Sequence, residues 1–165
     1  MKAYAEGTSV TVERSRAELD AILNRNGAKQ TMIANDDEKC VAVIGFVING
    51  AKFRLELPLP SYADTMPAKG KEPQRWWSMG EEARKSWRSS RFHQARRERW
   101  RAVLLLLKSK LEIVRIGLSS VEREFMADMV LPGGATAYEA LSEALRSGLV
   151  TGERKMLGPP APEAT

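Results

Sequence analysis

The sequence predicts an α+β protein in which an antiparallel sheet carries helices on one face. An Asn-Gly pair stands between two alternating apolar segments, and a long segment further on has apolar residues at helical spacing. The predicted order is β-α-β-β-β, then a long loop, a long basic helix and two C-terminal helices that pack on one face of the sheet. Residues 1–150 are expected to form one domain with a long irregular loop at 61–80, and residues 151–165 a disordered tail.

The first two elements are predicted from alternation and from capping residues. Apolar and polar residues alternate from Thr8 to Glu13, which is typical of a short strand. A helix is expected to follow over residues 16–26. Ser15 and Glu18 have the spacing of a capping box, and Gly27 is a usual helix end.

A β-hairpin is predicted around Asn49-Gly50, because both residues tolerate the positive φ of a tight two-residue turn. The flanking strands run from Cys40 to Ile48 and from Ala51 to Pro58, and a further strand is expected over residues 29–34. A two-residue loop fixes the pairing, and the pairs on one face are all apolar: Ile48 with Ala51, Phe46 with Phe53, Ile44 with Leu55, and Ala42 with Leu57.

Residues 81–116 are predicted to form one long helix that ends at Gly117. Its core-facing stripe is Trp100, Val103, Leu104, Leu107, Leu111 and Val114.

Two capping boxes predict the C-terminal helices. Ser119 with Glu122 opens a helix that is expected to reach Val130. Thr136 with Glu139 opens the last one. The side chains expected to face inward from this last helix are Tyr138, Leu141 and Leu145.

Positive charge is concentrated in one part of the chain. The formal net charge is +5, but residues 69–110 hold 13 Lys and Arg against four Asp and Glu, while the rest holds 13 against 17. Such a local field favours polyanions, although a solvated helix face explains the same charges. Arginine matches phosphate, and tryptophan can stack on bases. The candidate nucleic-acid contacts are Arg75, Trp76, Trp77, Arg84, Lys85, Arg88, Arg91, Arg96, Arg97 and Arg101.

Arg96 has an unusual position, because it falls on the line of the apolar stripe one turn before Trp100, with His93 close by. Two interpretations remain open. Arg96 stacks on Trp100 as a cation–π pair, or these residues form a small anion site at the edge of the core.

The sequence offers little for catalysis. It has one cysteine, Cys40, and one histidine, so neither a disulfide nor a zinc cluster is expected, and Cys40 lies in an apolar strand. A metal-dependent nuclease would need Glu-x-Lys on a strand, but Pro58 instead of lysine stands two residues after Glu56. We therefore expect no catalytic residue, no cofactor and no bound metal.

Localisation follows from what the chain lacks. No apolar segment has the length of a membrane span, and the N-terminal residues lack the apolar stretch of a signal peptide. We expect a cytoplasmic protein without a membrane partner.

Three segments, residues 4–10, 99–105 and 125–132, resemble small proteins of bacteriophages and prophages, and the likeness covers most of residues 4–140. The resemblance implies a bacterial cytoplasm during phage activity, where nucleic-acid handling and interference with host or rival machinery are common tasks. It carries no activity and no catalytic residue. The element order also resembles that of double-stranded RNA-binding domains, α-β-β-β-α, but a fold does not fix a function.

The sequence thus favours a non-enzymatic accessory protein that binds nucleic acid through its basic helix and loop. The alternative is a protein-interaction module, an inhibitor or adaptor of host or rival machinery, that docks an acidic partner surface with the same arginines. Strand type, sequence preference, partner identity and oligomeric state stay open.

Overall fold

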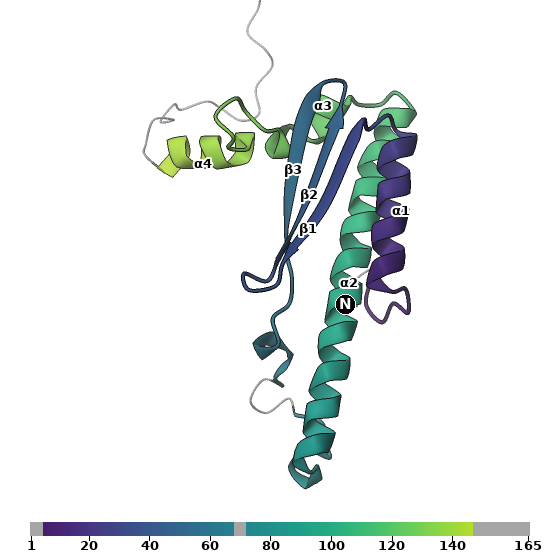
Figure 1. The fold of residues 1–165 in the computed structure, drawn as a ribbon, viewed down its shortest axis with the longest axis vertical. Coiled ribbons are helices and arrows are strands. Elements are labelled where there is room, and N and C mark those ends of the chain that lie inside the picture. The colour runs from purple at the N-terminus through teal and green to yellow at the C-terminus, as the bar shows by residue number, and fades with distance from the viewer. Residues whose placement is uncertain (1–4, 68–71, 147–165) are drawn as a thin grey trace, which may run out of the picture.

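A computed structural model describes residues 5–67 and 72–146. Its elements are α1 (Val12–Arg25), β1 (Gln30–Asp36), β2 (Val41–Ile48), β3 (Ala51–Pro58), α2 (Glu81–Arg115), α3 (Val121–Glu124) and α4 (Ala137–Arg146). The three strands form an antiparallel sheet in the order β1-β2-β3, and α1 and α2 lie side by side along one face of it (Figure 1). The α+β class is therefore confirmed.

The strand predicted at Thr8–Glu13 is wrong, because α1 already begins at Val12. The hydroxyl of Thr11 accepts the backbone N–H of Arg14 at 3.2 Å and caps the helix. Ser15, the expected cap, lies one turn inside α1 and is fully buried. The helix therefore uses the earlier of two possible caps, and the small side chain of Ser15 lies inside the packed interior.

The Asn49-Gly50 hairpin is confirmed with the predicted register. Asn49 has a φ of 52° and Gly50 a φ of 79°, as a turn of this kind requires. All four apolar pairs occur in the β2–β3 ladder. The residues of that face that are buried are Ala42, Ile44, Phe46, Ile48, Phe53 and Leu57, while Ala51 and Leu55 are half-buried.

The core lies where the sheet meets α1 and the C-terminal half of α2. The residues of α2 buried in it are Trp100, Leu104, Leu107 and Leu111, and those of α1 are Leu19, Ile22 and Leu23. Three phenylalanines complete it. The Phe46 ring stacks on Phe53 at 5.1 Å and meets the edge of Phe125 at 5.3 Å. The predicted stripe of the long helix is thus the stripe that packs, with Val103 and Val114 at its half-buried margin.

The N-terminal half of α2 extends well past the end of the sheet (Figure 1). Buried residues of α2 begin only at Trp100, so residues 81–99 have a different environment. The described parts of the segment predicted as an irregular loop, residues 61–67 and 72–80, run beside this half of the helix and form 3-10 turns at Ala63–Thr65 and Trp76–Ser78. The long helix therefore has one end that belongs to the core and one end that does not.

The helix predicted from Ser119 to Val130 is wrong. Ser120 rather than Ser119 is the cap, α3 is a single turn, and a 3-10 turn follows at Met126–Asp128. The backbone N–H of Val130 then donates to the carbonyl of Lys52 at 2.8 Å. This pairing with the edge of β3 ends the helix, because a tertiary backbone hydrogen bond overrides a local helical pattern.

The last helix, α4, begins at the predicted capping box but does not pack as expected. The backbone N–H of Thr136 donates to the Glu139 carboxylate at 2.6 Å, and the N–H of Glu139 donates to the Thr136 hydroxyl at 3.2 Å. Tyr138 is 65% exposed and Leu141 is 56% exposed, so their predicted inward orientation is wrong. The side chain of Leu145 and the tail 151–165 lie outside the described residues.

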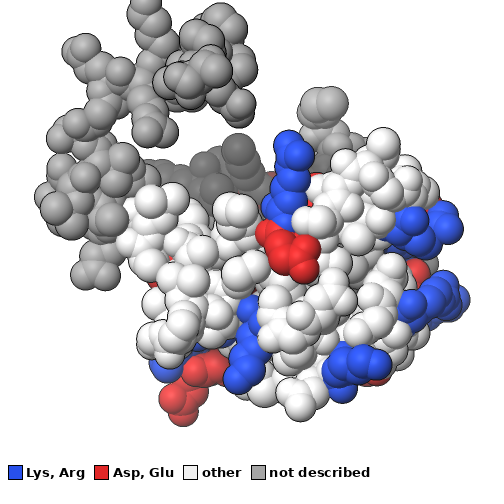
Figure 2. All heavy atoms as spheres, turned by 90° about the horizontal axis from the view of Figure 1, so that it is seen from above, with Lys and Arg blue, Asp and Glu red and all other residues white. Residues whose placement is uncertain are grey.

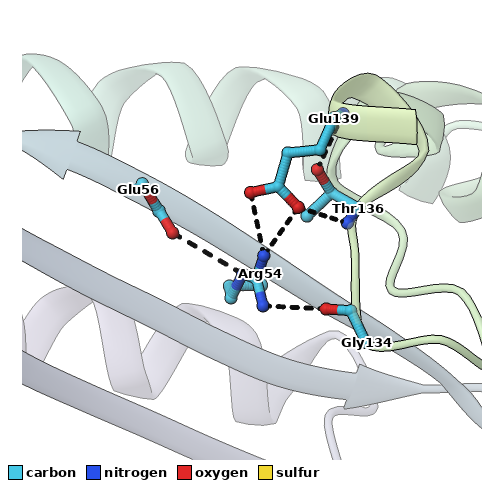
Figure 3. A network of polar contacts seen from close by, with 5 residues as sticks. All are labelled: Arg54, Glu56, Gly134, Thr136 and Glu139. Carbon is cyan, nitrogen blue, oxygen red and sulfur yellow. Dashed lines mark hydrogen bonds and ion pairs between the residues drawn. The ribbon is translucent and has the colours of Figure 1, made fainter. Parts of the chain in front are cut away.

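One carboxylate connects α4 to the sheet (Figure 3). Arg54 of β3 donates to both oxygens of Glu139, at 2.9 and 2.8 Å, and to the carbonyl of Gly134 at 3.0 Å. Hydrogen bonds from Thr136 and then the charge of Arg54 hold the pKa of Glu139 below its ordinary value. The Glu139 carboxylate therefore caps α4 and ties it to β3 at the same time.

Replacing Glu139 with alanine is expected to release α4 and leave the core intact. The amide hydrogens of α4 should exchange several-fold faster, while those of β2 stay protected, because α4 buries little apolar surface. Since the pKa of Glu139 is lowered in the folded state, its contribution is complete above the ordinary glutamate range and is lost as the pH falls through the lowered value.

Hydrogen exchange followed by mass spectrometry measures this effect. Glu56→Ala is the matched control, because Glu56 approaches Arg54 only at 3.7 Å. Unchanged exchange in α4 of the Glu139 variant would contradict the role of this contact.

Candidate nucleic-acid interface

The two adjacent tryptophans have different environments. Trp76 is 7% exposed, and its ring meets the Trp87 ring of α2 edge-on at 5.3 Å. Trp77 is 76% exposed. The 3-10 turn thus docks one ring on the helix and presents the other to solvent. Of the predicted pair, only Trp77 is available as a stacking surface.

Arg84 holds this turn against α2. Its Nε donates to the carbonyl of Trp76 at 3.0 Å and its Nη2 to that of Trp77 at 3.4 Å, while the guanidinium lies over the Trp76 ring at 5.5 Å. Arg84, a predicted nucleic-acid contact, is half-buried. It positions Trp77 through the backbone that carries it.

Two more of the predicted arginines stack on aromatic rings. The Arg88 guanidinium lies over Tyr62 at 4.3 Å, and that of Arg91 lies over Trp87 at 5.6 Å. Neither forms an ion pair with a carboxylate of the described residues. A guanidinium stacked on a ring keeps the N–H donors in its plane free to reach phosphate.

Arg96 does not stack on Trp100, so this interpretation is wrong. Its Nη2 donates to Asp37, in the turn between β1 and β2, at 2.7 Å, and its guanidinium lies over the Phe92 ring at 5.3 Å. The cation over Trp100 is Arg16 of α1, at 5.4 Å. The stripe position of Arg96 is tolerated because the sheet has ended there and a carboxylate faces the helix.

Arg97 and Arg101 are also held by neighbours. Arg97 donates to the side-chain oxygen of Gln94 through its Nε at 3.2 Å and also through its Nη2. Arg101 forms an ion pair with Glu18 of α1 at 2.8 Å, and both side chains are largely buried. Arg101 therefore joins the two helices and is not part of an exposed basic surface.

Five of the predicted contacts lie together towards the free end of α2. We call this the α2 tip, formed by Arg75, Trp77, Lys85, Arg88 and Arg91; Arg88 is half-buried and the other four are exposed. Within the described residues, no carboxylate is paired with Arg75 or Lys85. Figure 2 looks along the long axis at the opposite end of the molecule, where Lys and Arg side chains are spaced apart and several lie beside Asp or Glu.

Residues 5–67 and 72–146 contain no group of three or more His, Cys, Asp or Glu side chains that could hold a metal ion. None of the helices described there is long and apolar enough to cross a membrane.

Comparisons with known proteins returned no match. No protein-family model, no curated protein and no solved structure is significantly similar to this chain.

Proposed function

We propose that this protein is a non-enzymatic accessory protein that binds nucleic acid through the α2 tip. The observation that carries the proposal is Trp77, a large apolar ring 76% exposed at the end of a basic helix. An exposed aromatic ring offers a face on which a base can stack, and every base has such a face. Arg84 fixes the backbone that carries the ring.

The cations around Trp77 supply the second requirement, which is neutralisation of phosphates. Arg75 and Lys85 are exposed, and the guanidinium groups of Arg88 and Arg91 lie over aromatic rings without a carboxylate partner among the described residues. Glu81 and Glu82 in the first turn of α2 oppose this charge while stabilising the helix start. The combination of a stacking ring and several cations is that of a single-strand binder.

Binding should weaken steeply as salt increases, because phosphate contacts release counterions. Fluorescence anisotropy with labelled single- and double-stranded DNA and RNA at two or more salt concentrations measures this. Lys85→Gln should weaken binding to all sequences alike and reduce the salt slope by about one unit. Lys108→Gln is the control, because Lys108 is an exposed lysine of the same helix outside the tip.

Failure to bind any of these nucleic acids below roughly 10⁻⁴ M, the usual range of non-specific binding, would contradict the proposal. If Lys85→Gln and Lys108→Gln weakened nucleic-acid binding equally, the phosphate contact would not be specific to the α2 tip.

A protein partner is the second candidate, and α4 favours it. Tyr138 and Leu141 expose apolar surface on a helix that Arg54 holds at the edge of the sheet. The partner would be a protein of the bacterial host or of a rival element, and an acidic surface on it would bind the basic residues of the α2 tip. A pull-down from bacterial lysate with and without nuclease treatment distinguishes the two proposed functions. Only a directly bound protein partner is still captured after the nucleic acid has been digested.

A further inference from the structure

A cleft of about 370 Å³ lies between the start of α1, the turn between β1 and β2, and the middle of α2. These three segments approach one another near the end of the sheet that lies away from the hairpin (Figure 1). Three arginines line the cleft, Arg16 from α1 and Arg96 and Arg97 from α2, together with His93. Arg16 lies far from the other two in the sequence, so only the fold brings the three together.

Each of these arginines is positioned by a neighbour and keeps further donors. Arg16 donates one N–H to the carbonyl of Ile33 at 3.3 Å. Arg96 donates to Asp37, and Arg97 to Gln94. A guanidinium has five N–H donors, and the structure assigns only one or two on each of these three. Preformed donors of this kind bind an oxyanion without first having to be ordered.

Trp100 forms part of the wall of this cleft. It is 1% exposed, and its indole N–H has no hydrogen-bond partner among the described residues. A buried donor without a partner is rare and costs free energy. The start of α1, from Thr11 to Glu13, also lines this cleft, and the positive end of the helix dipole favours an anion there.

We propose that this cleft binds a phosphate monoester group. Glu13 and Asp37 also line the cleft, and their carboxylates would repel a long polyanion lying across it, so the ligand we propose is a single phosphate group held by the arginines. The side chain of Asp37 is 73% exposed, which leaves it free to turn away from Arg96 when a phosphate enters. The proposal does not rest on the α2 tip, because none of the tip residues lines this cleft.

Titration with inorganic phosphate, followed through the four tryptophan indole N–H signals in NMR spectra, tests the proposal. The Trp100 signal should shift and saturate at phosphate concentrations of about 1–10 mM, in the range of a ligand this small. The Trp77 signal should stay in place. Sodium chloride at matched ionic strength is the control. A Trp100 signal that does not move with phosphate, or moves equally with chloride, overturns the proposal.

Two variants locate the anion. Arg97→Gln should weaken phosphate binding about tenfold, because it removes a charged donor. Arg99→Gln is the matched control, since Arg99 is exposed and does not line the cleft. Arg16→Gln should weaken binding similarly but also removes the cation over Trp100, so its thermal unfolding must be measured alongside. Equal binding by the Arg97 and Arg99 variants would overturn the proposal.

The phosphate can belong to a small molecule or to the end of a strand. Single-stranded oligonucleotides with and without a 5′-phosphate distinguish these sources. A Trp100 shift that needs the 5′-phosphate assigns the strand end, and a shift with inorganic phosphate but with neither oligonucleotide assigns a small molecule. Trp77→Ala separates this site from the tip, because it should weaken strand binding and leave phosphate binding unchanged.

Discussion

Replacing Phe46 with alanine is expected to destabilise the protein by about 3–5 kcal/mol. Phe46 is almost completely buried at the centre of the sheet, and its ring contacts both Phe53 and Phe125. Truncation removes its buried apolar surface, leaves a cavity that the paired strands cannot close, and loses two aromatic contacts. The effect is large because these three rings join β2, β3 and the segment after α3 into one core.

Urea unfolding followed by circular dichroism measures this loss. Val47→Ala is the matched control, because Val47 is the next residue of β2, points to the opposite face and is only half-buried. Its cost should be clearly smaller. A loss below about 1 kcal/mol for Phe46→Ala would be within the range of a surface substitution and would contradict this description of the core.

Replacing Trp77 with alanine is expected to weaken binding to single strands by about 1–3 kcal/mol, or about 5- to 150-fold. The reason is that its exposed ring stacks on a base, and alanine offers no such face. Binding to duplex should change much less, because paired bases are already stacked on one another. Stability should change little, since the ring is mostly in solvent.

Trp77→Phe is the first control and should restore most of the binding, because it keeps an aromatic face. Trp76→Ala is the second control. Trp76 is buried against Trp87, so its loss should reduce stability and the order of the turn. Anisotropy titrations with single- and double-stranded oligonucleotides of one sequence measure the difference. An equal loss on both would show that Trp77 is not a stacking surface.

The sequence by itself determined the elements whose causes are local. The Asn49-Gly50 turn and its apolar pairs are confirmed, because turn chemistry and alternation act over a few residues. The helix predicted over residues 81–116 is confirmed as Glu81–Arg115, with the predicted core stripe. The Thr136–Glu139 capping box is confirmed for the same reason.

Two local patterns in the sequence predicted the wrong helix boundaries. Ser15 was the predicted cap of the first helix, but Thr11 caps α1 and Ser15 is buried inside it. The pattern after Ser119 is helical, but the edge of β3 offered Val130 a backbone partner. In both cases a contact between residues distant in sequence set the helix boundary. Such a contact contributes more free energy than the small difference in local helix propensity.

The candidate site shows the same division. Sequence located the basic, tryptophan-bearing end of α2, since charge and composition are visible along the chain. It could not tell that Trp76 is buried while Trp77 is exposed, or that Arg101 pairs with Glu18. Nothing in the sequence pattern predicted that Arg16 would lie over Trp100, because this contact depends on how α1 packs against α2. The partner of a side chain is set by the tertiary structure, since elements far apart in sequence supply it.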